Sequence, residues 1–178
     1  MIIPPQKTAA VHGTMVAVRY RFTPIERGEA KEIAAWRYEG VYSLYDGDPE
    51  GFETLLQPEY RVHSARGEHG ELVGFCSFGE DARVAGYDYA DDALDVGLGM
   101  RPDLVGRGLG IGFTRAVLEF AEREYSPSAF RVTVAGFNRR AQRLCLALGF
   151  REAARFPQAQ SGNEFVVLRR EDRASSPQ

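Results

Sequence analysis

The sequence predicts a mixed α+β fold in which a mostly antiparallel central sheet is flanked by helices within a single layered domain. Short alternating strands and a hairpin fill the first half of the chain, and strands alternate with strongly periodic helices in the second half. The length of 178 residues suits one domain. We place this domain at residues 14–170, between a loose N-terminal arm (1–13) and a disordered tail (171–178).

In the N-terminal half, each element follows from a local pattern. Alternation of apolar and polar side chains predicts a strand over 15–22, and Thr23-Pro24-Ile25-Glu26 has the form of a capping box that opens a helix ending near Arg37. Further along, the patterns predict a short helix over 50–56, a hairpin formed by 60–65 and 71–78, a polar loop over 80–92 and a strand over 93–100.

The C-terminal half alternates strands and helices. Apolar residues recur every three or four positions after residue 108, which indicates a helix packed on the core. The patterns predict a helix over 108–125, a strand over 129–135, a helix over 139–148 and a final antiparallel pair over 151–156 and 164–168.

Composition excludes several classes of protein. Apolar residues make up 44% and charged residues 26%, as in ordinary globular domains. No segment has the length of a membrane span or the layout of a signal peptide, so we expect a cytoplasmic protein with no membrane partner. Cys76 and Cys145 lie in hydrophobic stretches and are expected to be buried free thiols. With three scattered histidines and no Cys/His cluster, no metal site is expected.

The charge is unevenly distributed along the chain. Residues 1–100 contain 17 acidic and 9 basic side chains, whereas residues 101–151 contain nine arginines and four acidic side chains. The arginine-rich part suits a polyphosphate ligand, and the acidic part argues against nucleic acid as a partner. Chance charge on a solvated surface is the alternative for the acidic part.

A glycine-rich loop separates the strand over 93–100 from the following helix. Its glycines at 106, 108, 110 and 112 let the backbone approach a ligand, and the first amides of a helix have no internal partner. Together with the helix dipole they form an anion site suited to a phosphate group. The Gly-Lys-Ser/Thr of a P-loop is missing, and a spacing of two excludes the dinucleotide fingerprint. An ordinary turn before a helix is the alternative.

The run Arg107-x-x-Gly110-x-Gly112 resembles the Arg/Gln-x-x-Gly-x-Gly/Ala signature of the GNAT superfamily of acetyl-CoA-dependent N-acetyltransferases. Asn138, opening a helix that closes on Leu148-Gly149-Phe150, resembles the second hallmark of the family. The resemblance covers residues 16–170 and implies acetyl-CoA as co-substrate. It places cofactor contacts at Leu98, Gly99, Met100, Arg107, Gly108, Leu109, Gly110, Ile111, Gly112, Asn138 and Arg143.

Two glycines in the strand before the loop, Gly97 and Gly99, are explained either by close approach of this ligand or by a bulge.

The expected side-chain chemistry departs from the family pattern. Where many members have a tyrosine that protonates the leaving thiolate, this chain has Cys145, which is either the proton donor or a packing thiol. Where others have a glutamate base, it has Thr133. We expect Asp95 to be the base, with Glu80 next, unless Asp95 is an ordinary hydrogen-bonded strand residue or water removes the proton.

Aromatic and acidic side chains indicate the acceptor. Trp36, Tyr38, Tyr42 and Tyr45 lie where family members form the acceptor cleft, and their faces suit an ammonium group, although core packing fits their spacing as well. The acidic run from Glu80 to Asp95 favours a cationic acceptor.

We therefore expect direct transfer of acetyl to a primary amine of a small cationic molecule, in a ternary complex, by a monomer or homodimer. The alternatives are a protein N-terminal or lysine acetyltransferase and a non-catalytic acyl-CoA-binding domain.

Overall fold

The computed structural model of the chain describes residues 19–90 and 92–171. Seven strands form one sheet in the order β1-β2-β3-β4-β5-β7-β6. All neighbouring pairs are antiparallel except β4 and β5, which are parallel. The strands are β1 (Arg21–Pro24), β2 (His63–Arg66), β3 (Leu72–Phe78), β4 (Leu94–Met100), β5 (Ala129–Ala135), β6 (Arg151–Pro157) and β7 (Glu164–Glu171). The prediction of a mixed, mostly antiparallel sheet flanked by helices is confirmed.

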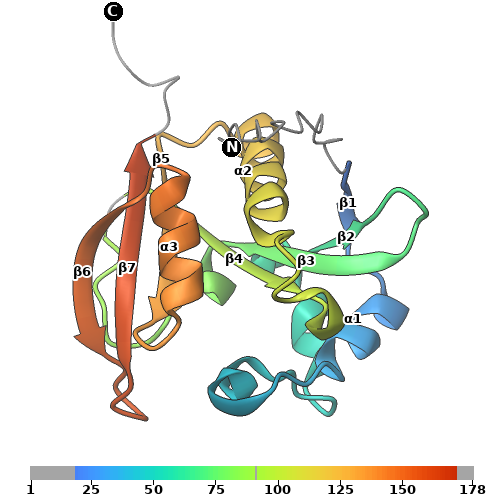
Figure 1. Cartoon of the computed structure of the whole chain (residues 1–178), viewed down its shortest axis with the longest axis horizontal. Coiled ribbons are helices and arrows are strands. Elements are labelled where there is room, and N and C mark those ends of the chain that lie inside the picture. Colours follow the sequence, from blue (N-terminus) through green and yellow to red (C-terminus); the bar gives the residue numbers. More distant parts are fainter. Residues whose placement is uncertain (1–18, 91, 172–178) are drawn as a thin grey trace, which may run out of the picture.

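The sheet opens between β4 and β5. These strands pair only at Leu94 with Phe130 and at Asp95 with Arg131. Along the rest of its length β4 pairs with β3, and β5 pairs with β7 over all seven of its residues. Figure 1 shows the consequence, because β3 and β4 cross the picture obliquely while β6 and β7 run steeply. Beyond residues 95 and 131 the two halves of the sheet diverge and leave a gap.

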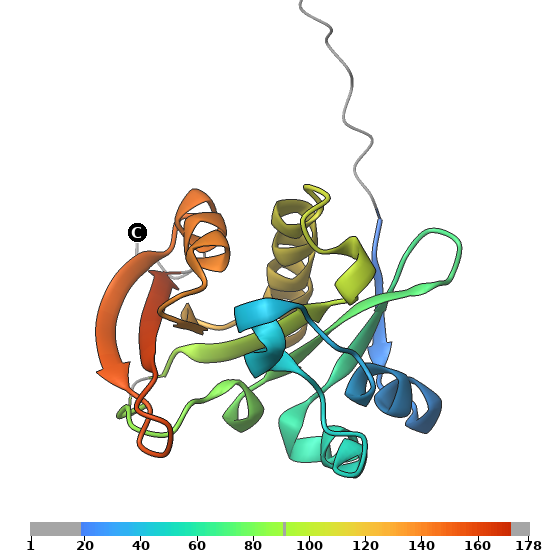
Figure 2. The ribbon, with the colours of Figure 1, turned by 60° about the horizontal axis from the view of Figure 1, so that its bottom comes forward.

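The helices cover both faces of the sheet. Helices α2 (Gly110–Tyr125) and α3 (Arg139–Ala147) lie on one side, and α1 (Arg27–Ala34) lies on the other with the short 3-10 turns that follow it (Figure 2). Phe113, Val117 and Phe120 of α2 pack against Phe78 and Phe130 of the sheet in the main core. A second cluster packs Ile33 and Trp36 of the α1 region against Leu72.

Helix α1 begins later than the sequence pattern predicts. Thr23 and Pro24 end strand β1, so the expected capping box at 23–26 is wrong. The helix is capped at Glu26 instead, whose backbone N–H donates to Oε2 of Glu29 at 2.9 Å. The other oxygen of Glu29 accepts a hydrogen bond from Arg66 at 2.6 Å, so one buried carboxylate ties the start of α1 to strand β2.

Other boundaries differ by a few residues. The helix predicted over 50–56 is a 3-10 turn over Phe52–Leu56, α2 begins at Gly110 rather than 108, and α3 ends at Ala147. Strand β7 runs through Glu171, so residue 171 belongs to the sheet and not to the predicted tail. The predicted arm 1–13 and residues 172–178 lie outside the described part of the chain, as do residues 15–18 of the first predicted strand.

A buried ion pair joins the two halves of the sheet at their last point of contact. Nε of Arg131 donates to Oδ1 of Asp95 at 2.5 Å, and its NH2 group donates to Oδ2 at 2.8 Å. Both side chains are buried, with exposed fractions of 1% and 2%. Arg83 adds a third bond to Oδ2 at 2.7 Å, and the Arg131 guanidinium lies 4.7 Å from the ring centroid of Tyr89. This cluster fixes where the strands separate.

Within the described ranges, no helix is long and apolar enough to cross a bilayer.

Arg131→Leu is expected to lower the free energy of unfolding by about 3 kcal/mol, because breaking a buried ion pair costs this much while an apolar side chain still fills the space. Urea denaturation measures the change. Glu53→Ala is the control, because its ion pair with Arg27 is exposed and should contribute less than about 1 kcal/mol. Equal effects of the two variants would show that the Asp95–Arg131 pair does not anchor the sheet.

Candidate active site

Backbone amides face the gap from both sides. The N–H of Arg101 donates to Val73 and the N–H of Gly79 donates to Asp95, so odd-numbered residues of β4 direct their backbone polar groups toward β3. By the alternation of an antiparallel ladder, the N–H groups of Leu98 and Met100 point away from β3 into the gap. Gly99, expected to be a third contact of this kind, faces β3 instead.

On the opposite side, Ala135 of β5 directs its N–H into the gap. The following residue, Gly136, donates its N–H to Glu164, the residue that precedes Phe165 on β7. Because neighbouring residues of a strand alternate, the N–H of Ala135 points away from β7. The gap is therefore lined by main-chain donors from two strands that belong to different halves of the sheet.

Two causes were suggested for Gly97 and Gly99 of β4, namely close approach of a ligand and a bulge. The structure shows a third. A Cβ at Gly97 would collide with Oγ of Ser77, and a Cβ at Gly99 would collide with the ring of Phe75. The ladder between β3 and β4 has no register shift, so there is no bulge. Both glycines make room for side chains of the neighbouring strand.

The glycine loop ends in a set of unpaired amides. Gly106 and Gly108 have φ angles of +84° and +80°, which side chains other than hydrogen rarely tolerate. The first intrahelical bond of α2 runs from the N–H of Phe113 to Leu109, and no side chain caps the helix. Among the described residues, the N–H groups of Gly110, Ile111 and Gly112 therefore have no partner. With the helix dipole they form a site for an anion.

Arginine side chains lie in this loop and on the helix beside it. Arg107 lies within it and is exposed, and the guanidinium of Arg140 lies 3.8 Å from where a Cβ of Gly106 would be. Arg143 is exposed on the same helix, α3. Several guanidinium groups near unpaired amides suit a ligand with more than one phosphate charge.

Two of the three tyrosines predicted to bind the acceptor span the gap. Tyr38 Oη donates to the carbonyl oxygen of Met100 on β4 at 2.9 Å. Tyr45 Oη accepts from the N–H of Ala135 at 3.4 Å and from Nδ2 of Asn138 at 3.2 Å. The segment between them includes the 3-10 helix η1 (Gly40–Tyr45), seen in front of β4 in Figure 2. This aromatic segment, residues 38–45, therefore bridges the two diverging strands.

The third tyrosine, Tyr42, packs away from the gap. Its ring meets Phe137 edge-on at 5.8 Å, and the guanidinium of Arg140 lies 4.7 Å from its centroid. A face already occupied by a guanidinium does not suit an acceptor ammonium, so the expected acceptor role of Tyr42 does not fit this arrangement.

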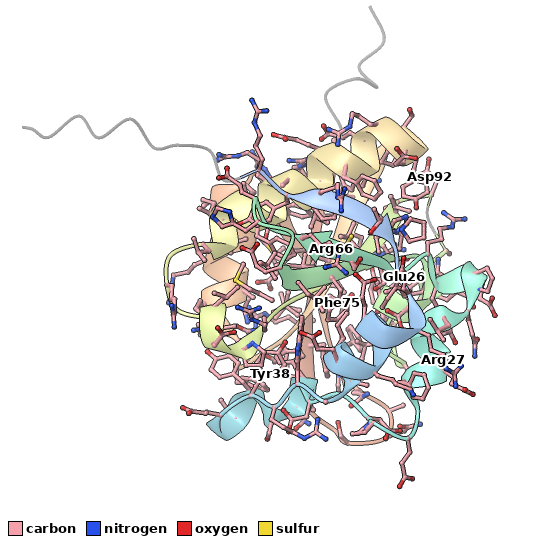
Figure 3. The ribbon with its side chains drawn as sticks, turned by 90° about the vertical axis from the view of Figure 1, so that its right-hand side faces the viewer. Glu26, Arg27, Tyr38, Arg66, Phe75 and Asp92 are labelled. Atoms are coloured by element: carbon pink, nitrogen blue, oxygen red, sulfur yellow. The ribbon has the colours of Figure 1, made fainter. Side chains whose placement is uncertain are left out.

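A cavity of about 290 Å³ lies beside the gap. Three of the residues predicted to bind the acceptor, Trp36, Tyr38 and Tyr45, line it. Phe52, Leu55 and Phe75, which were not predicted from the sequence, line it as well. Figure 3 shows Tyr38 and Phe75 on this side of the molecule. Asp48 supplies the only charged side chain of the lining. No sequence pattern marks Phe52 and Phe75, because they come from separate elements.

A larger cavity, about 600 Å³, lies at the far end of α3 and is lined by charged side chains of α2, β6 and β7. None of the predicted site residues borders it.

Residues 9–151 match the sequence profile of the acetyltransferase (GNAT) domain, which is more than half of the chain. The chain belongs to the GNAT acetyltransferase family.

Solved acetyltransferases have the same fold. A chimera of the spermidine N-acetyltransferase SpeG from Vibrio cholerae and hSSAT superposes with a TM-score of 0.69 at 16% identity, covering 85% of this chain and 95% of that one. A putative acetyltransferase from Acinetobacter baylyi gives 0.65 at 20% identity, with coverage of 90% and 98%. The ribosomal-protein-S5-alanine acetyltransferase of Vibrio fischeri gives 0.61 at 14%, with coverage of 89% and 96%. No curated protein sequence matches the chain.

Within this GNAT domain, Asp95 does not fit the role of general base. Both of its oxygens accept hydrogen bonds from guanidinium groups, and its side chain is 2% exposed. Glu80 is exposed, but it follows β3 beyond Phe78, which pairs with Val96. It therefore lies near the start of β4, whereas the aromatic segment meets Met100 at its end. Of the other acidic residues of this run, Asp81, Asp88 and Asp92 do not line the cavity, and Asp91 lies outside the described residues.

Cys145 is poorly suited to donate a proton. Its thiol is 3% exposed within the main core, and burial raises its pKa to about 12. Asn138 also has a structural role, because its Oδ1 accepts from the N–H of Ala141 and caps α3 while its Nδ2 holds Tyr45. Thr133 contacts the hydroxyl of Tyr89 at 3.2 Å. Among the described residues, no group of three or more His, Cys, Asp or Glu side chains forms a metal site.

Gly112→Asp is expected to weaken coenzyme A binding at least tenfold, because it adds a negative charge beside the unpaired amides. A Cβ there meets no atom within 4 Å, so the fold should persist. Gly28→Asp in the first turn of α1 is the matched control, with equally open surroundings. Isothermal calorimetry should find the loss in the first variant only; equal affinities would exclude this loop as the phosphate site.

Cys145→Ala is expected to lower the free energy of unfolding by about 1 kcal/mol and leave acetyl transfer within a few-fold of the original rate, as for a small core truncation. Thermal denaturation and steady-state kinetics measure the two effects. A hundredfold drop in kcat without loss of stability would make Cys145 the proton donor after all.

Proposed function

We propose that this GNAT domain transfers the acetyl group of acetyl-CoA to the primary amine of a small molecule, directly and within a ternary complex. The observation that supports this proposal is the gap between β4 and β5. The glycine loop follows β4, and Tyr38 and Tyr45, which line the aromatic cavity, contact Met100 and Ala135 at the two edges of this gap. A phosphate-bearing cofactor and an amine can thus meet at one point. We propose residues 14–170 as the catalytic unit.

The cofactor would extend from the loop into the gap. The amides of Gly110, Ile111 and Gly112 would hold its pyrophosphate, with Arg107 and Arg143 nearby, and the amides of Leu98 and Met100 would hold the arm and the thioester oxygen. Donors fixed in a strand need no reorganisation when negative charge develops on that oxygen. Holding both reactants in place supplies much of the remaining acceleration.

The reaction then needs few side chains. The bound ammonium first loses one proton, and the neutral nitrogen then attacks the thioester carbonyl carbon. A C–N bond forms, the nitrogen loses a second proton, and the C–S bond breaks as its electron pair moves to sulfur. Neither Asp95 nor Glu80 is positioned to take these two protons, so in this proposal water removes both.

The cavity favours an acceptor with one positive charge and an apolar body. Trp36, Phe52, Leu55 and Phe75 present apolar surface, and Asp48 is the only carboxylate. The volume corresponds to roughly ten water-sized groups. A second ammonium group placed against the apolar wall would lose its hydration without a partner. We therefore propose a monocationic arylalkyl or alkyl amine rather than a polyamine.

A second candidate function is acetylation of a protein or peptide N-terminus. It is favoured by apolar side chains that remain exposed at the aromatic segment and beside α3, namely Val41 at 64%, Leu44 at 42% and Phe137 at 38%. Exposed apolar side chains of this kind can pack against an extended peptide.

Among acceptors supplied with acetyl-CoA, 2-phenylethylamine is expected to have a kcat/KM at least tenfold above those of spermidine and phenylalanine. Release of the coenzyme A thiol and mass spectrometry of the product measure this. An alanine-initiated peptide tests the second candidate. Leu55→Asp should lower the ratio of kcat/KM for 2-phenylethylamine to kcat/KM for spermidine, because it adds a carboxylate to the cavity wall. Unchanged coenzyme A affinity would show that this variant is folded.

Faster reaction of spermidine would overturn the proposed acceptor class and leave the acetyltransferase assignment intact. Absence of thiol release with every amine and peptide would overturn the assignment itself.

A further inference from the structure

Tyr45 is placed at the junction of the two halves of the site. Its side chain lines the aromatic cavity, and its hydroxyl oxygen contacts the N–H of Ala135, which points into the gap. Its exposed fraction is 40%, so solvent reaches the side chain. A cofactor arm that follows the gap and an amine that fills the cavity would both pass this hydroxyl.

The hydrogen bonds of Tyr45 leave its proton available. Both contacts of its oxygen, from Ala135 and from Nδ2 of Asn138, are donated to it, since a backbone N–H and an amide NH2 have no lone pair to offer. Within residues 19–90 and 92–171, no acceptor contacts the Tyr45 hydroxyl proton. Tyr38 has the opposite arrangement, because its proton is already donated to the carbonyl of Met100.

We propose that Tyr45 donates the proton that the leaving thiolate of coenzyme A takes up, a role that Cys145 in the core cannot fill. This inference rests on the proposed acetyl transfer. When the C–S bond breaks, its electron pair stays on sulfur, the O–H bond of Tyr45 breaks, and an S–H bond forms. The products are the free thiol and a phenolate, which water then reprotonates.

The surroundings of Tyr45 suit this step. The two N–H groups already directed at its oxygen would stabilise the negative charge of the phenolate, as preorganised donors do at an oxyanion. Burial raises the pKa of Tyr45, while the hydrogen bonds from Asn138 and Ala135 lower it. A phenol kept neutral near pH 7 is the form that donates.

The ionisable groups that face Tyr45 come from its own segment and from α3. Tyr42, on the same 3-10 helix, is the titratable neighbour that acts on it, and Arg140 of α3 lies over the ring of Tyr42. Asp46 accepts the N–H of Tyr38, and Asp48 lines the cavity.

Tyr45→Phe tests the proposal, because it removes the donor and retains the ring. We expect kcat to fall about a hundredfold, the usual contribution of a positioned acid, with KM for acetyl-CoA and amine within threefold. Tyr87→Phe is the matched control and should reduce kcat by less than fivefold, because Tyr87 packs beside Phe156 and does not line the aromatic cavity. A kcat of Tyr45→Phe within threefold of the original would overturn the proposal.

The pH dependence of kcat distinguishes a proton-donating Tyr45 from one that has only a structural role. Replacing Tyr45 with 3-fluorotyrosine keeps the hydroxyl and its contacts but lowers the pKa of the phenol. The alkaline limb of kcat should move to lower pH in this variant and should be missing in Tyr45→Phe. A limb that stays in place would show that Tyr45 only positions Asn138 and would overturn the proposal. Absence of turnover by the original enzyme would overturn the proposed function and this inference together.

Discussion

The ion pair between Asp95 and Arg131 determines the geometry on which the rest of the molecule depends. It lies at the last register position shared by β4 and β5, and both side chains are buried. Before this point the two halves form one sheet. After it, neither strand has a partner on the inner edge, and the backbone groups there are left for other uses. A charged pair, whose geometry is directional, fixes the point of separation more sharply than apolar contacts would.

A second constraint acts across the opening. The aromatic segment 38–45 contacts Met100 through Tyr38 and Ala135 through Tyr45. Side chains thus connect β4 and β5 where the two strands no longer pair. The capped end of α3 is part of the same arrangement, because Asn138 both caps the helix and holds Tyr45. The two diverging strands and the start of α3 are therefore linked by hydrogen bonds of Tyr38, Tyr45 and Asn138.

The sequence predicted the parts of this site that local patterns encode. The glycine loop, the strand over 129–135 and the helix opened by Asn138 all depend on neighbours a few residues apart. The partner of Asp95 could not be predicted, because Arg131 lies 36 positions away and only the strand register brings them together. The reason for a glycine at position 99 could not be predicted either, because the ring of Phe75, which fills the space of a Cβ there, belongs to the adjacent strand. Phe52 and Phe75 likewise line one cavity only because of tertiary packing.

The main-chain donors of the gap have an evolutionary consequence. The N–H groups of Leu98 and Met100 are supplied by any amino acid except proline, whatever its side chain. Natural selection can therefore exchange the side chains around the opening, and with them the preferred acceptor, without removing the groups that would hold the acyl donor. The three solved acetyltransferases share this fold at 14–20% identity, as expected if most side chains can be exchanged. A scaffold of this kind can acquire new specificities by ordinary point mutations.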